Sequence, residues 1–411
     1  MIYFLLILML LLSFVKIFPL HLALNLIFLV AVFPYKNFNY RLLGLVLFGS
    51  IPVFLGFLGF FENPILFDLF RDAYYFSNPL LYSLIGFSIA SRISINTFIE
   101  IYVKLGVIYS GIFLILTFLL FFRNGEISYV LIRNEVSPGN ILPLISLAIL
   151  AYDKYYGLEL SLSKKVKIIA MLLNALVFVS MGSRTYLIIG ILIFFSLSIK
   201  KISIVKVAYT ISALLVAAVI FIAVLDSSKG DGVSFTDKLA VSFTEMAVQD
   251  YSSTSDMSNH LRGFEAFMAY KNFEQFPLLQ QLLGKGFGYL LDLGVVVPYG
   301  DMAELQFVPI IHNGYFYILL KVGILGILFY LIWYFLIYRQ LSVFIKRLKL
   351  KEHSGNDKFL FACKFGKVAV IALLFTNLVI LGLFNAEMGF LHIFLFGTLT
   401  SVKHLTSKRT I

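Results

Sequence analysis

The stretch VKLGVIYSGIFLILTFLLFF, at residues 103–122, contains one charged side chain, Lys104. A helix of roughly 20 apolar residues is long enough to cross the hydrocarbon core of a bilayer. The whole chain has this character, because 60% of its 411 residues are hydrophobic, 13% are charged and its mean hydropathy is +0.94. Since a soluble domain has about 25% charged residues, the sequence predicts an integral membrane protein.

Apolar runs recur along the chain. They lie at residues 1–15, 17–34, 42–60, 79–93, 103–122, 139–152, 166–182, 185–199, 203–225, 310–338, 368–384 and 388–402. We therefore predict an all-α, polytopic bundle of about 12 transmembrane helices. The first run is interpreted as a retained helix rather than a cleaved signal peptide. The predicted division is a helical part at 1–225, a large polar loop at 226–309 and a helical part at 310–411.

Lysines and arginines mark alternate connections between these runs. The densest cluster lies in segment 339–367: Arg339, Lys346, Arg347, Lys349, Lys351, Lys358, Lys364 and Lys367. Because basic connections stay in the cytoplasm, both termini are predicted to be cytoplasmic. The net charge of +11 is attributed to this orientation signal and not to nucleic-acid binding. The single Cys363 cannot form an internal disulfide.

The loop at 226–309 is then extracytoplasmic, and it holds half of the 22 acidic residues of the chain. Loops of this length usually carry function. Five apolar residues recur within it near a helical period: Leu261, Phe264, Phe267, Met268 and Phe273. This pattern predicts a short amphipathic helix on the membrane face, although a helix that merely plugs the bundle would show the same pattern.

The hairpin MGSRT, at residues 181–185, joins two apolar runs on the predicted outer side. The rule that basic residues stay in the cytoplasm gives no reason for an arginine, Arg184, on the outer side. A guanidinium offers a planar fork of donors that fits phosphate, so we interpret Arg184 as a clamp for a lipid-borne diphosphate. The alternative is an arginine that reaches the lipid headgroups from a helix end.

Two further features of the loop could bind an anion. Arg262 opens the amphipathic stretch, and LGKGFG at 283–288 is a glycine-rich turn that contains Lys285 and Gly286. Glycines let backbone N–H groups approach an anion, but no Lys-Ser/Thr follows as in a P-loop. A nucleotide sugar is therefore not expected as the direct donor.

His312, with Asn313 and Tyr315, begins the next apolar run and places an imidazole at the outer end of a helix. Such a histidine could hold an anion or exchange a proton, or it could simply be interfacial. Lys321 points to the opposite face by helical spacing and needs water or a partner to offset its burial. Asn385 and Glu387 are secondary candidates for the same outer cavity.

The six histidines show no metal-ligand spacing, so neither a metal nor another cofactor is expected. Among the acidic residues of the loop, Asp256, Glu265 and Glu304 are candidate general bases that the sequence does not rank.

Three segments in order resemble the superfamily of O-antigen ligases and Wzy-type O-antigen polymerases. They are GSRT at 182–185, Arg262 with Pro277 and GKGFG at 284–288, and HNGY at 312–315 followed by LKVGILG at 320–326. The resemblance covers roughly residues 166–338.

The resemblance implies glycan transfer from undecaprenyl diphosphate in the bacterial inner membrane, without nucleotide or metal. With the arguments above it assigns His312, Arg262 and Arg184 to catalysis. It assigns substrate binding to Arg184, Arg262, Lys285, Gly286, Asn313 and Tyr315. Expected partners are lipid-linked oligosaccharides as donor and acceptor, membrane lipids and a chain-length regulator.

A polymerase is favoured over a ligase that transfers glycan to a lipid A core. A flippase for lipid-linked sugars is the second alternative, but such transporters show repeated halves, and here one large loop breaks any symmetry. A non-catalytic scaffold would not need the two arginines and the histidine.

Overall fold

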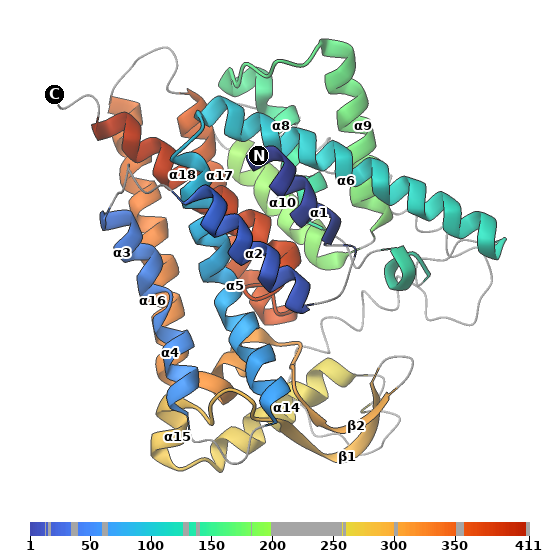
Figure 1. Ribbon diagram of the computed structural model, residues 1–411, viewed down its shortest axis with the longest axis vertical. Coiled ribbons are helices and arrows are strands. Elements are labelled where there is room, and N and C mark those ends of the chain that lie inside the picture. The colour runs from blue at the N-terminus through green and yellow to red at the C-terminus, as the bar shows by residue number, and fades with distance from the viewer. Residues whose placement is uncertain are drawn as a thin grey trace.

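The structure is a computed structural model, and it describes residues 1–12, 14, 18–33, 40–59, 65–125, 131–136, 140–181, 183–198, 257, 260–299, 303–350 and 357–407. This part of the chain is mostly helical (Figure 1). Three of its helices are long and apolar enough to cross a membrane: α6 (Ile95–Asn124), α16 (Gly314–Leu350) and α17 (Asp357–Val379). These helices fit the predicted membrane protein.

The other helices are shorter or less apolar. They are α1 (Ile2–Leu12), α2 (Phe18–Val32), α3 (Tyr40–Phe48), α4 (Ile51–Leu58), α5 (Leu66–Ala90), α8 (Leu142–Tyr156), α9 (Lys164–Ser180), α10 (Arg184–Ser198), α14 (Leu261–Glu274), α15 (Leu278–Leu283) and α18 (Gly389–Ser407), with a π-helical turn η1 (Ile132–Val136) and a 3-10 turn η2 (Ala386–Met388). The predicted number of about 12 spans is not confirmed. The run at 42–60, for example, is divided into α3 and α4 by a turn at Gly49 and Ser50, and the run at 203–225 lies outside the described residues.

Helix α5 packs closely against α18 in the centre of the bundle. A Cβ atom on Gly86 of α5 would lie 2.3 Å from the carbonyl oxygen of Ile393, and one on Gly389 would lie 2.5 Å from the Tyr82 ring. Small residues at such positions allow helix backbones to approach in a membrane, where packing rather than water drives association. The Phe76 ring of α5, 4.7 Å from that of Phe384, fills the space beside this contact.

Helix α5 begins at Leu66, well before the apolar run predicted at 79–93. Its first turns contain Asp68, Arg71 and Asp72, all three of which are buried. The predicted start was wrong because charged residues end an apolar run in the sequence, whereas here they pair with one another inside the protein.

Helix α16 is interrupted at Gly323, where φ is 68° and ψ is −170°. The glycine-rich turn at 284–288 packs into this break: Lys285 N–H donates to the Leu320 carbonyl (2.8 Å) and Gly286 N–H to the Lys321 carbonyl (3.0 Å). Carbonyl groups next to a break lack helical partners. The turn therefore satisfies the backbone acceptors that the break exposes.

We expect Gly323→Ala to lower the melting temperature of the detergent-solubilised protein, because the added Cβ would lie 2.3 Å from the Leu282 carbonyl oxygen. The backbone conformation at this position is one that glycine adopts and other residues rarely do, at a cost of about 1–3 kcal/mol. Gly111→Ala in α6 is the control, since no atom of the described residues lies within 4 Å of a Cβ there. Equal melting temperatures for the two variants would contradict this account of the break.

The segment before α16 is not purely helical. Strands β1 (Leu291–Tyr299) and β2 (Ala303–Val308) form an antiparallel hairpin, so the all-α prediction with only short helices in this loop needs correction. The stretch LDLGVVVPY is rich in β-branched residues, which favour strands, and a search for helical periods does not detect it. The predicted amphipathic helix is confirmed as a helix, α14.

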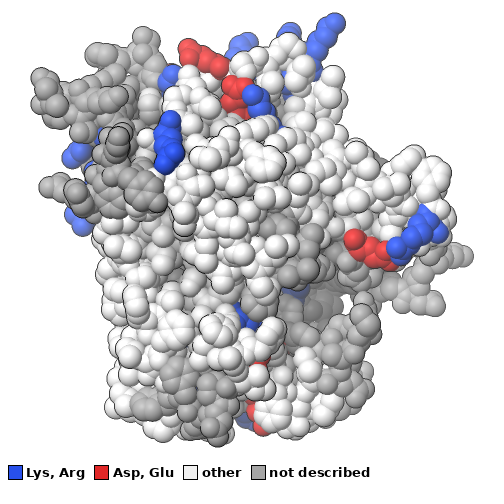
Figure 2. Space-filling view, viewed as in Figure 1, with Lys and Arg blue, Asp and Glu red and all other residues white. Residues whose placement is uncertain are grey.

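Helices α14 and α15 and the β-hairpin gather at one end of the molecule, which we call the hairpin end (Figure 1). The last turns of α16, the first turns of α17 and the end of α18 lie at the other end, which we call the terminal end. Most Lys and Arg residues visible in Figure 2 lie toward the terminal end, and a broad band below them is almost uncharged. This distribution agrees with the charge asymmetry that the sequence predicts.

The predicted orientation can be tested by labelling single cysteines in a Cys363→Ser background. We expect a cysteine at Phe307, which is 50% exposed in β2, to react with a membrane-impermeant thiol reagent added to intact cells with a permeable outer membrane. A cysteine at the exposed Lys349 of α16 should react only after the inner membrane is permeabilised. The reverse pattern would overturn the orientation.

Candidate functional site

A buried carboxylate and a partly exposed imidazole form a pair at the hairpin end. Glu265 comes from α14, and His312 lies two residues before the start of α16. One carboxylate oxygen, Oε2 of Glu265, lies 2.9 Å from Nδ1 of His312 and accepts the His312 backbone N–H at 3.0 Å. The Glu265 side chain is fully buried, whereas that of His312 is 35% exposed. The carboxylate therefore fixes both the backbone and the ring of this histidine.

This arrangement is suited to proton transfer. A carboxylate on Nδ1 orients an imidazole and stabilises its protonated form, so that Nε2 is the nitrogen that exchanges a proton with a substrate. The sequence did not rank Asp256, Glu265 and Glu304 as candidate bases. The structure places Glu265 in contact with His312. Asp256 lies outside the described residues, as does the side chain of Glu304.

Arg262 lies on the same helix as Glu265, three residues earlier. Residues three apart share one side of an α-helix, so α14 directs Arg262 and Glu265 to neighbouring positions. Glu265 contacts His312 and lies about one helical turn from Arg262. Two of the predicted catalytic residues, Arg262 and His312, are therefore at the same end of the molecule.

Asn313 and Tyr315 have structural contacts of their own. The Asn313 side-chain oxygen accepts the backbone N–H groups of Tyr315 (3.0 Å) and Phe316 (3.2 Å), as an N-cap of α16 does. The Tyr315 hydroxyl donates to the Leu374 carbonyl at 2.9 Å. These bonds explain both residues as supports of α16, and their binding of substrate stays a prediction.

The glycine-rich turn does not offer its backbone to an anion. Besides the two bonds to α16, Phe287 N–H donates to the Gly56 carbonyl (2.9 Å) and Gly288 N–H to the Asp72 carboxylate (2.8 Å). The four N–H groups from Lys285 to Gly288 are thus all used within the protein. These bonds argue against anion binding by the Gly286 backbone. Substrate binding by Gly286 and by the Lys285 ammonium, which lies 5.2 Å from the centre of the Phe276 ring, stays a prediction.

Arg184 is the first residue of α10, and its side chain lies outside the described part of the chain. Two residues later, the Tyr186 hydroxyl donates to the carboxylate of Glu387 at 2.9 Å. The start of α10 therefore lies beside η2. Glu387, which η2 contains, was a secondary candidate for the outer cavity. Asn385 caps η2 by accepting the Glu387 N–H at 3.2 Å.

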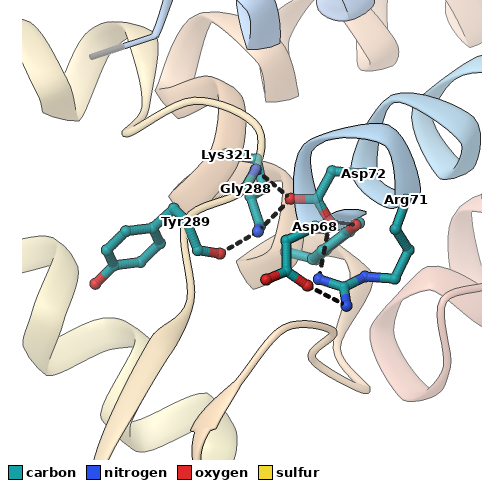
Figure 3. A network of polar contacts seen from close by, with 7 residues as sticks. Asp68, Arg71, Asp72, Gly288, Tyr289 and Lys321 are labelled. Carbon is teal, nitrogen blue, oxygen red and sulfur yellow. Dashed lines mark hydrogen bonds and ion pairs between the residues drawn. The ribbon is translucent and has the colours of Figure 1, made fainter. Parts of the chain in front are cut away.

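A second polar cluster surrounds the carboxylate of Asp72 on α5 (Figure 3). Lys321 of α16 places its ammonium 2.5 Å from Oδ2 of Asp72 and also donates to the Tyr289 carbonyl. The Tyr317 hydroxyl donates to Oδ1 of Asp72 at 2.6 Å. Lys321 therefore has the partner that its predicted burial requires, and this ion pair joins α5, α16 and the glycine-rich turn.

Arg71 lies on the other side of Asp72 from Lys321 (Figure 3). Its Nη1 atom is 2.6 Å from Oδ1 of Asp68, and Nη2 is 3.9 Å from Oδ1 of Asp72. Sequence reasoning missed Asp68, Arg71 and Asp72. Their spacing was the available signal, because positions three and four apart lie on one face of a helix.

Comparisons with known proteins do not decide the family. No model of a known protein family matches the chain. A search of curated proteins finds no significant match. Within the described residues, no group of three or more His, Cys, Asp or Glu side chains could hold a metal ion. The resemblance to O-antigen polymerases and ligases therefore rests on the three sequence segments alone.

Proposed function

We propose that the protein polymerises oligosaccharide repeat units carried on undecaprenyl diphosphate, at the outer face of the bacterial inner membrane. The observation that supports this most is the pair of Glu265 and His312 at the hairpin end. An imidazole that a buried carboxylate orients and stabilises as a cation is the group that activation of a sugar hydroxyl needs.

In the proposed reaction, His312 Nε2 takes the proton of an acceptor hydroxyl while that oxygen bonds to the anomeric carbon of the donor sugar. The bond from this carbon to the diphosphate oxygen breaks, and the electron pair leaves with undecaprenyl diphosphate. Glu265 stabilises the imidazolium, which later returns its proton to water or to the leaving group. Arg262 and Arg184 offset the charge that develops on the diphosphate.

Two other functions remain as alternatives. A ligase would use the same donor chemistry and a lipid A core sugar as acceptor. A flippase would suit the broken helix α16, because transporters often use such breaks to line a substrate site. Here, however, the turn at 284–288 occupies the carbonyl groups of Leu320 and Lys321, which argues for a structural break.

The test is to incubate the purified protein with a lipid-linked repeat unit and to measure the lengths of the lipid-linked products. We expect a ladder of longer chains. In a parallel reaction with lipid A core, transfer to the core without chain extension would favour the ligase. No transfer to either acceptor, together with movement of the intact substrate across proteoliposomes, would replace the proposal by the flippase.

A further inference from the structure

Helix α15 exposes its first two residues at the hairpin end. Leu278 is 72% exposed and Leu279 is 53% exposed, and within the described residues neither belongs to the hydrophobic core. Single exposed leucines are normal, whereas an apolar patch that continues across several elements marks contact with a membrane or with a partner. The surroundings of these two leucines therefore decide their role.

Helix α15 packs against α4 and α16, and it lies directly beyond the end of α4 (Figure 1). A Cβ atom on Gly59, just after α4, would lie 2.1 Å from the Gly286 Cα atom, and one on Gly323 of α16 would lie 2.3 Å from the Leu282 carbonyl oxygen. The residues next to these two contacts are exposed and apolar. With the two leucines of α15 they form what we call the apolar band: Phe57 (43%), Leu58 (69%), Leu278, Leu279, Ile324 (38%) and Leu328 (46%).

The apolar band extends onto a helix that can span the bilayer. Ile324 and Leu328 lie four residues apart on one face of α16, which is long and apolar enough to cross a membrane. Exposed apolar side chains on such a helix face acyl chains. Because α15 packs against this helix at Gly323, lipid is the partner that fits its two leucines.

Polar residues flank α15 on both sides. Glu274 and Gln275 are exposed just before it, and after it the Lys285 ammonium lies over the Phe276 ring. Lysines and aromatic rings are typical of the boundary between headgroups and acyl chains. The change from exposed polar to exposed apolar side chains between Gln275 and Leu278 therefore marks this boundary.

The backbone of this segment suits a shallow position in lipid. Gln281 N–H donates to the Pro277 carbonyl (3.0 Å) and Gly284 N–H to the Gln280 carbonyl (2.7 Å). The Gln281 side chain donates to the Phe276 carbonyl at 3.0 Å. Since backbone groups without partners are costly in hydrocarbon, these bonds lower the cost of placing α15 at the boundary.

We propose that Leu278 and Leu279 insert into the bilayer leaflet at the hairpin end, so that α15 is an interfacial helix. Part of the loop that the sequence places outside the membrane then rests in it. The turn at 284–288, which binds the break in α16, joins this lipid contact to the spanning helix. The proposal concerns the position of α15 and is independent of the reaction proposed above.

The test places single spin labels on cysteines in a Cys363→Ser background, with the protein in nanodiscs of phosphatidylethanolamine and phosphatidylglycerol. Collisions of the label with oxygen, which concentrates in hydrocarbon, are compared with collisions with a water-soluble nickel chelate. The labelled sites are Leu279, the exposed polar control Gln275 and the reference Leu328 on α16. We expect the ratio of oxygen to nickel accessibility to rise from Gln275 through Leu279 to Leu328.

Three results would overturn the proposal. A ratio at Leu279 equal to that at Gln275 would place α15 in water. A label at Leu279 that is shielded from both reagents would show that protein covers the helix. A ratio at Leu328 as low as that at Gln275 would show that the apolar band does not face lipid on α16 either.

Leu278→Cys repeats the measurement if the label at Leu279 disturbs the fold, as a lowered melting temperature would show. Both side chains are exposed, so a label at either position needs no space in the core. The polymerase proposal fails separately, if α15 lies in lipid but the protein forms no longer chains.

Discussion

His312→Gln is expected to slow chain extension by at least about 100-fold, the lower end of what a positioned acid–base group contributes. Glutamine can still hydrogen-bond to Glu265 but cannot take up a proton. The rate is measured with the purified protein and a lipid-linked repeat unit at saturating concentration, so that a change in kcat is separated from a change in binding. His21→Gln on α2 makes the same chemical change elsewhere and should leave the rate unchanged.

The pH profile distinguishes the two roles considered for this histidine. A general base becomes competent as it deprotonates, so the wild-type rate should rise with pH through a limb that is absent in His312→Gln. A rate that falls with pH, with this limb lost in the variant, would instead assign His312 to anion binding. A variant that turns over like wild type with the same profile would make the histidine merely interfacial.

Glu265→Gln isolates the contribution of the buried charge to the same step. The glutamine side chain can still accept from the His312 backbone and ring, so the geometry should be largely retained while stabilisation of the imidazolium is lost. We expect a smaller reduction in rate than for His312→Gln. A rate equal to that of wild type would mean that the carboxylate serves only to hold the backbone before α16.

Asp72→Asn is expected to produce the largest loss of stability, about 3–5 kcal/mol, because it leaves the Lys321 ammonium buried without its counter-charge. Lys321 and Asp72 are 2% and 0% exposed, so water cannot replace the lost partner. The free energies of unfolding of wild type and variants are compared in detergent by denaturant titration. Where unfolding is not reversible, their melting temperatures rank the same proteins by stability.

The double variant Asp72→Asn/Lys321→Met is the matched comparison, because it removes both charges. Replacing a whole buried ion pair by neutral groups is often close to neutral in stability, so the double variant should be more stable than Asp72→Asn alone. If the two are equally unstable, the charges of Asp72 and Lys321 are not coupled in the folded protein, which would contradict this account of the ion pair.

Composition was enough to predict a mostly helical fold with helices long and apolar enough to cross a membrane, because a bilayer demands both high apolar content and a minimum helix length. The number of spans was harder. Runs such as 42–60 are apolar throughout, yet Gly49 lies where a Cβ would be 2.7 Å from the Trp333 ring, and the chain turns there to meet α16. Such tertiary contacts leave no trace in a hydropathy pattern.

The site was predictable only in part, for a related reason. Arg262 and His312 became candidates through their residue types and their positions beside apolar runs. The pairing of Glu265 with His312 joins residues 47 positions apart, and that of Asp72 with Lys321 joins residues 249 apart. One sequence does not show which of many acidic residues meets a given cation across the bundle. The packing of the glycine-rich turn against α16 was not predicted, because close backbone packing and anion binding both require glycine.

We propose that the chain extends lipid-linked glycans with a base at the hairpin end, on the outer face of the membrane. The most direct test uses proteoliposomes in which protease accessibility of the C-terminus has established the orientation, with the lipid-linked repeat unit supplied to either leaflet. We predict long chains only when substrate reaches the leaflet at the hairpin end, and none with His312→Gln. Equal extension from both leaflets, or extension by His312→Gln at the wild-type rate, would contradict the claim.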